Sequence, residues 1–130
     1  TVGAIPIAPA HEDAVALECA YRQIAVALAA GDVVCLFPEG KLTASGELQV
    51  FRQGVQHIVE RTPVPVVPMA LRGLWGSFFS RHGGAAMSRP FKRGILNRLE
   101  LVIGAPVSPA QATPENLRDK VLKLRGPWPV

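Results

Sequence analysis

A short apolar run that ends at a Pro-Glu-Gly sequence constrains the fold of this chain more than any other feature. Residues 33–37 are all apolar and bounded by residues that break regular structure, so they predict a buried strand. The proline that follows has no N–H and cannot extend a ladder, so the chain must turn there. An acid, a glycine, a base and a hydroxyl then stand in the predicted loop: Glu39, Gly40, Lys41 and Thr43. The carboxyl end of a strand is where open α/β sheets bind ligands.

Helical and strand patterns on both sides of this loop predict the fold class. The pattern predicts helices over residues 12–30 and 51–62, strands over 66–71 and 99–103, and a last helix with Thr113 as N-cap and Pro114 at its first position. Alternating helices and strands are typical of the α/β class. We therefore expect residues 1–130 to form a single α/β domain, an open mixed sheet flanked by helices.

Positive charge gathers in one part of the chain. The net charge is +4, yet no Asp or Glu lies between Glu60 and Glu100. That span contains seven cations: Arg61, Arg72, Arg81, Arg89, Lys92, Arg93 and Arg98. This imbalance indicates an anionic partner, either phosphate, a membrane surface or nucleic acid, or else a basic loop that faces solvent.

Three aromatic residues and two cysteines bear on where the protein acts. Trp75, Phe78 and Phe79 stand beside the cations, where they predict either core packing or docking at a bilayer interface. Cys19 and Cys35 fall in a predicted helix and a predicted strand, and we expect both to be buried free thiols. Such thiols suit a reducing compartment, so the cytoplasmic face of a membrane is the expected location.

Two blocks of sequence, in this order and spacing, resemble a known family. Residues 37–40 read Phe-Pro-Glu-Gly, and residues 64–71 read Val-Pro-Val-Val-Pro-Met-Ala-Leu. They are similar to the third and fourth conserved blocks of the glycerolipid acyltransferases, the family that includes the 1-acylglycerol-3-phosphate acyltransferases. The resemblance covers residues 3–72. It implies transfer of an acyl group from an acyl thioester, either acyl-CoA or an acyl carrier protein, to a hydroxyl of a glycerophosphate or lysophospholipid, with no metal and no bound cofactor.

The catalytic part of this resemblance does not match. In the family a His, oriented by an Asp that follows after four intervening residues, takes the proton from the attacking hydroxyl. The three histidines of the chain are followed at that spacing by other residues: His11 by Ala16, His57 by Thr62 and His82 by Met87. We therefore expect the catalytic His and Asp upstream of Thr1, the chain to be the C-terminal portion of an acyltransferase domain, and no activity in these residues alone. A natural loss of the block is the alternative.

The resemblance and the needs of a phosphate-bearing acceptor together predict six substrate-binding residues: Glu39, Gly40, Lys41, Thr43, Arg52 and Gly54. Lys41, the backbone at Gly40 and Arg52 offer cations and N–H donors to the phosphate, and Thr43 offers a hydroxyl. Glu39 is expected to accept a hydrogen bond from the acceptor hydroxyl, or to brace Lys41 or the missing His. Arg52 equally fits a surface charge.

Residues 41–43 depart from the commonest family form. Lys41, Leu42 and Thr43 stand where that form has Thr, Arg and Ser. Losing the Arg removes a fork-shaped phosphate donor, for which a lysine ammonium is not equivalent. This form is more similar to the branch that reacylates 2-acylglycerophosphoethanolamine.

Two other classes of function compete with an enzyme. A non-catalytic α/β module that binds lipid or an anionic membrane surface would use the basic and aromatic stretch between residues 61 and 98. A nucleotide- or nucleic-acid-binding domain is disfavoured, because the chain has neither a glycine-rich phosphate loop nor an aromatic-interleaved basic strand.

Overall fold

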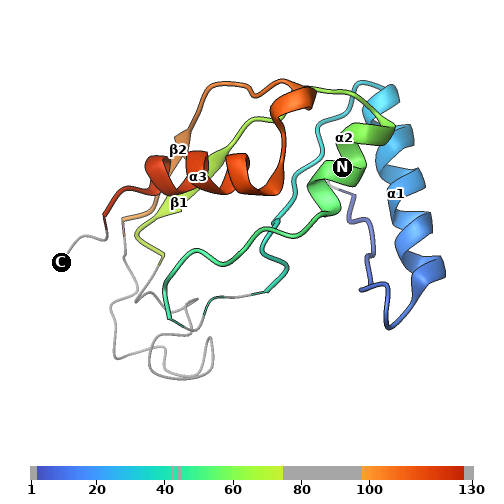
Figure 1. Ribbon diagram of the computed structural model, residues 1–130, viewed down its shortest axis with the longest axis horizontal. Coiled ribbons are helices and arrows are strands. Elements are labelled where there is room, and N and C mark those ends of the chain that lie inside the picture. The colour runs from blue at the N-terminus through green and yellow to red at the C-terminus, as the bar shows by residue number, and fades with distance from the viewer. Residues whose placement is uncertain (1–2, 42, 44, 75–97, 128–130) are drawn as a thin grey trace.

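The computed structural model describes residues 3–41, 43, 45–74 and 98–127. Figure 1 shows α1 (Ala14–Ala29), α2 (Gly54–Arg61), β1 (Met69–Arg72), β2 (Glu100–Ile103), a short 3-10 helix (Pro109–Gln111) and α3 (Pro114–Arg125). Helices and an open sheet within one chain confirm the predicted α/β class. Several predicted features lie outside the described residues: Leu42, Trp75, Phe78, Phe79, Arg81, His82, Arg89, Lys92 and Arg93.

The sheet of the described part has two antiparallel strands. Met69 pairs with Ile103 and Arg72 with Glu100, and an isolated bridge between Val66 and Val107 continues the pairing. Both strands were predicted, although β1 begins only at Met69, after a proline that supplies no N–H. Helix α3 packs across the two strands, as Figure 1 shows.

The strand predicted over residues 33–37 is wrong. The segment is extended coil, with Val33 95% and Phe37 76% exposed. An apolar run becomes a strand only when a neighbouring strand satisfies its N–H and C=O groups. Of the strands in the described residues, β1 pairs with β2 and neither pairs with 33–37. The sequence pattern specified an apolar extended segment but not its neighbour.

Helix α1 confirms the helix predicted over residues 12–30, although it begins two residues later and ends one residue earlier. The Asp13 carboxylate accepts a hydrogen bond from the N–H of Ala16 at 2.9 Å, and Gly31 follows the helix with a φ of +88°. Ala20 and Ile24 form its buried side. The helix packs against α2, where the sequence had predicted packing on a sheet.

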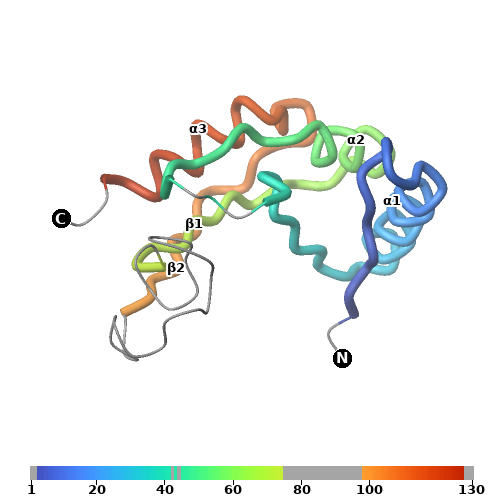
Figure 2. The backbone as a smooth tube through the Cα atoms, turned by 90° about the horizontal axis from the view of Figure 1, so that it is seen from below, coloured from blue at the N-terminus to red at the C-terminus, as the bar shows by residue number. Residues whose placement is uncertain are grey.

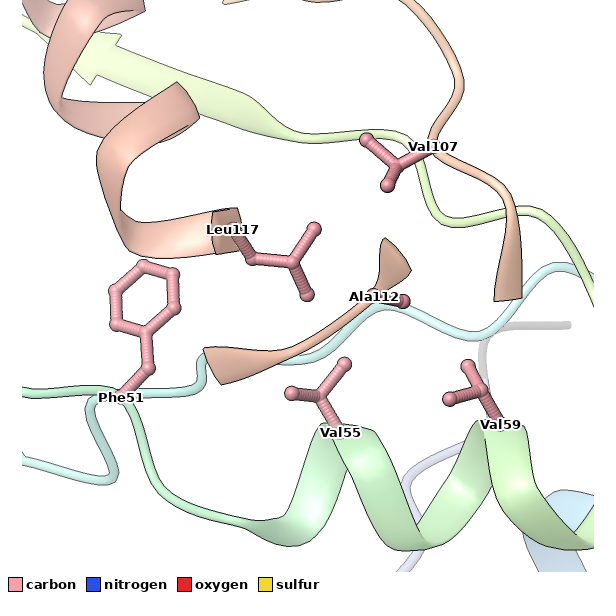
Figure 3. Close-up of a cluster of buried hydrophobic side chains, with 6 residues drawn as sticks. All are labelled: Phe51, Val55, Val59, Val107, Ala112 and Leu117. Atoms are coloured by element: carbon pink, nitrogen blue, oxygen red, sulfur yellow. The ribbon is translucent and has the colours of Figure 1, made fainter. Parts of the chain in front are cut away.

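The core lies between α2, α3 and the segment that precedes α3 (Figure 3). Its buried side chains are Phe51, Val55, Val59, Val107, Ala112 and Leu117. Helix α3 begins at the predicted N-cap, where the Thr113 hydroxyl accepts a hydrogen bond from the N–H of Asn116 at 3.3 Å. Leu117 thereby joins the same buried cluster as Phe51 (Figure 3).

Three of the seven cations predicted to be uncompensated lie in the described residues, and two of these, Arg61 and Arg72, have acidic partners. The Arg61 guanidinium donates to both carboxylate oxygens of Glu18, at 2.9 and 2.8 Å. Arg72 lies 3.4 Å from the carboxylate of Glu100 and also donates to the carbonyl oxygen of Leu124. The prediction failed here because acids remote in sequence lie close in space, and a count along the chain does not register them.

The prediction that Cys19 and Cys35 are buried is also wrong. Both thiols are free and exposed, since Cys19 lies on the outer side of α1 and Cys35 in the unpaired segment 33–37. Among the helices that the structure describes, none is long and apolar enough to span a bilayer.

Candidate functional site

The Pro-Glu-Gly sequence forms a tight turn. The N–H of Gly40 donates to the carbonyl oxygen of Phe37 at 3.1 Å, which closes a four-residue turn with proline in its second position. Gly40 has a φ of +66°. That is the left-handed region, where glycine is favoured over every residue that has a side chain. The turn predicted at the end of residues 33–37 is confirmed.

The turn is bonded to the segment 48–52, which leads into α2. The N–H of Arg52 donates to the carbonyl oxygen of Pro38 at 2.9 Å, and the N–H of Gln49 donates to Oε2 of Glu39 at 2.8 Å. A carboxylate that accepts from a backbone N–H forms one of the stronger kinds of hydrogen bond. Glu39 therefore braces a neighbouring loop, a partner that the sequence had not indicated.

The side chain of Arg52 lies over Gly40. A Cβ atom placed on Gly40 would come 2.6 Å from Nε and 3.1 Å from Cζ of Arg52, so only a glycine leaves room for the guanidinium in this position. Arg52 precedes α2, which begins at Gly54, and so does not lie in the first helical turn as predicted. Arg52 and Lys41 are exposed, and neither forms an ion pair with an acid in the part of the chain that the structure describes.

Thr43 and Gly54 have structural contacts of their own. The Thr43 hydroxyl accepts a hydrogen bond from the N–H of Gly46 at 3.0 Å and so fixes its own turn. Gly54 faces α1, where an added Cβ would lie 3.6 Å from the Tyr21 hydroxyl. This is an ordinary van der Waals distance, so the contact with α1 would accommodate a Cβ atom and does not by itself require a glycine at the start of α2. Of the six predicted residues, the structure brings together Glu39, Gly40 and Arg52, with Lys41 next in sequence.

Sequence reasoning missed Arg118 of α3. Its Nε donates to the carbonyl oxygen of Gln49 at 3.1 Å, and its Nη2 donates to that of Leu48 at 2.9 Å. Figure 2 shows the segment before α2 running alongside α3. The only signal in the sequence is that Arg118 follows Leu117, a predicted core position, and nothing in the pattern indicates which carbonyls it reaches.

The clear pKa shifts among the described residues belong to Glu18 of α1 and Arg61 of α2, away from the turn. Hydrogen bonds from Arg61 hold the pKa of Glu18 below its usual value, and the same bonds raise the pKa of Arg61. The Arg61 guanidinium also lies 5.2 Å from the centre of the Tyr21 ring. This group joins two helices and does not contact the turn.

The turn and its neighbours offer binding chemistry. The Arg52 guanidinium and the Lys41 ammonium suit a phosphate or carboxylate. His57 is exposed on α2, with Nδ1 3.7 Å from a carboxylate oxygen of Glu60. Within the described ranges, no three His, Cys, Asp or Glu side chains lie close enough to hold a metal ion.

Comparison with known protein families places part of the chain in one family. A family model described as Acyltransferase matches residues 1–72, which is more than half of the chain and includes the turn, Arg52 and β1. The chain belongs to the acyltransferase family. Membership indicates acyl transfer in lipid metabolism, with an acyl donor and a lipid acceptor as general substrates. No solved structure matches the chain.

Proposed function

We propose that this chain provides the acceptor-binding part of an acyltransferase that moves an acyl group from an acyl thioester to a glycerophosphate or lysophospholipid. The observation that carries the proposal is the Phe37–Gly40 turn, with the Arg52 guanidinium over Gly40 and Lys41 following. Both cations are exposed and face no acid in the described residues. An acceptor phosphate would supply the missing negative charge.

Arg52 bears on the phosphate donor that is missing at position 42. Position 42 is a Leu where the commonest family form has an Arg, so a planar phosphate donor is missing there. The Arg52 guanidinium provides such a fork beside the same turn. The backbone of Arg52 is fixed there by the hydrogen bond from its backbone N–H to the carbonyl oxygen of Pro38. Lys41 then acts as a second, point-like charge. This arrangement supports phosphate binding without an arginine at position 42.

The chemical step needs a base that removes the proton of the acceptor hydroxyl as its oxygen attacks the thioester carbonyl and the thiol leaves. None of the three histidines has an Asp at the family spacing. We therefore propose that a His–Asp pair outside these 130 residues supplies the base. The chain alone is expected to show no acyl transfer.

Acyl transfer by the whole protein tests this proposal. An acyl thioester, as acyl-CoA or acyl carrier protein, would be supplied with glycerol phosphate, lysophosphatidic acid or lysophosphatidylethanolamine. We expect transfer to at least one acceptor, and a fall in kcat/KM of about tenfold or more in Glu39→Gln, because the Gln49 N–H loses a charged acceptor. Glu60→Gln, at an exposed position of α2, is the matched control and should retain full activity.

Each outcome has a defined meaning. The preferred acceptor would decide between phosphatidic acid synthesis and the 2-acylglycerophosphoethanolamine branch. Transfer that is equal in Glu39→Gln and Glu60→Gln would contradict a role for the turn. No transfer to any acceptor, with binding to anionic vesicles intact, would support a non-catalytic lipid-binding module in place of the enzyme.

A further inference from the structure

Arg118 of helix α3 is linked to the predicted site through two consecutive peptide units, on either side of the Cα of Gln49. The Glu39 carboxylate holds the N–H of Gln49 at 2.8 Å, while Arg118 of α3 holds the carbonyl oxygens of Gln49 and Leu48 at 3.1 and 2.9 Å. Residue 49 is thus bonded on one side to the turn and on the other to a helix that lies 69 residues away in sequence. The family match ends at residue 72 and does not include α3.

Apolar contacts also join α3 to the segment 48–52. Leu117, which precedes Arg118, is 3% exposed and belongs to the same cluster as Phe51, which precedes Arg52. Leu48 packs against that cluster. The segment 48–52 therefore lies between α3 on one side and the Phe37–Gly40 turn on the other (Figure 2).

We infer that Arg118 is a positioning residue for acceptor binding: it fixes the segment 48–52 and, through it, Glu39 and the Arg52 guanidinium. The inference rests on the proposed function for its consequence in catalysis. An arginine is required because Nε and Nη2 reach two successive carbonyls together, whereas a lysine has one ammonium group and cannot span them in a fixed geometry. Both carbonyl bonds are part-buried, so water replaces them poorly.

Arg72 provides a matched control. It also donates from Nε and Nη2 to a backbone carbonyl, that of Leu124, and so also joins α3 to another element. It has no contact with residues 48–52 among the interactions of the described residues. Arg72→Lys should weaken the attachment of the end of α3 and leave the hydrogen bonds of Gln49 intact. Arg118→Lys should instead weaken the hydrogen bonds that hold the Leu48 and Gln49 carbonyls.

The first experiment uses the 130-residue chain and follows the backbone N–H of Gln49 by amide hydrogen exchange. We expect exchange at Gln49 to become at least about tenfold faster in Arg118→Lys, as the loss of one charge-assisted hydrogen bond predicts, and to be unchanged in Arg72→Lys. Equal exchange at Gln49 in both variants would overturn the inference, because Arg118 would then act only through general stability. This readout does not depend on catalysis.

The second experiment measures steady-state kinetics in the whole protein. Arg118→Lys should raise the KM for the phosphate-bearing acceptor about tenfold and leave the KM for the acyl donor unchanged, while Arg72→Lys changes neither. A double variant of Arg118→Lys with Glu39→Gln should be non-additive, because both side chains act on residue 49. An unchanged acceptor KM, with transfer intact, would overturn the positioning role. Absence of transfer in the unmodified protein would instead count against the proposed function, and the exchange data would still decide the inference.

Discussion

Replacing Gly40 with alanine tests the link between the turn and the Arg52 guanidinium. Gly40 has a φ of +66°, a region that costs a residue with a side chain about 1–2 kcal/mol. Alanine also reduces the entropy of the unfolded chain, which offsets about 0.4–1 kcal/mol of that cost. The net loss in the free energy of unfolding should be about 1 kcal/mol. The new methyl group would in addition lie 2.6 Å from Nε of Arg52 and force that exposed side chain to move.

Gly31→Ala is the matched control. Gly31 also has a positive φ, +88°, but nothing lies within 4 Å of a Cβ added there. Both variants should therefore lose similar stability in urea unfolding. Only Gly40→Ala should raise the KM for a phosphate-bearing acceptor, by about tenfold for the loss of a charge-assisted hydrogen bond.

Two results would refute this reasoning. Equal acceptor KM values in the two variants would show that the position of Arg52 over Gly40 has no part in binding. A much larger loss of stability in Gly40→Ala than in Gly31→Ala would show that the Arg52 side chain cannot move aside, and hence that it is a fixed structural element.

Three further predictions concern the stability of the fold that supports the site. Leu117→Ala should lower the free energy of unfolding by about 2–5 kcal/mol in a denaturant titration, since this side chain is 3% exposed at the centre of the core (Figure 3); a loss below about 1 kcal/mol would contradict the core assignment. Thr113→Ala should cost about 1 kcal/mol through loss of the cap of α3, measured in the same way, with Thr113→Ser expected to restore it. Because Arg61 lowers the pKa of Glu18, this ion pair stabilises the fold above the ordinary pKa of a carboxyl group and loses its effect as pH falls through the lowered pKa. Stability measured against pH should therefore decline less steeply on the acid side in Arg61→Met, and an unchanged slope would refute the pairing.

Local chemistry made much of this fold predictable. The N-cap at Thr113 and the helix before Gly31 depend on residues within a few positions of each other, so the sequence pattern indicates them directly. The cap at Asp13 was missed, because the predicted helix began at residue 12. Strands β1 and β2 were predicted from their own apolar runs, and each has the other as the neighbour that its N–H and C=O groups need.

The failures all depend on contacts between distant residues. Residues 33–37 have the composition of a strand, yet no strand of the described residues pairs with them. Arg61 counted as uncompensated until the fold placed Glu18 beside it. Arg118 reaches residues 48 and 49 only because α3 packs on the core, and a helical pattern does not determine which distant carbonyl a surface arginine meets.

Some features of the predicted site followed from the local sequence, and others depend on the folded chain. The turn that contains Gly40 was predicted from local chemistry, and the structure confirms it. The hydrogen bond from Gln49 to Glu39 and the position of Arg52 over Gly40 required the folded chain, because a loop of intervening residues brings them together. Gly54 was predicted to bind substrate, and in the structure it faces the Tyr21 hydroxyl of α1.

The most direct test of the account is the preference of the whole protein for an acceptor with a phosphate over one without. The measurement is the ratio of kcat/KM for lysophosphatidic acid to that for monoacylglycerol, in the unmodified protein and in a Lys41→Gln, Arg52→Gln double variant. We expect the unmodified protein to prefer the phosphate-bearing acceptor strongly. The ratio of kcat/KM values should fall at least about tenfold in the double variant, since both charge-assisted contacts are removed. An undiminished preference would contradict the central claim, because the phosphate would then be bound by other residues.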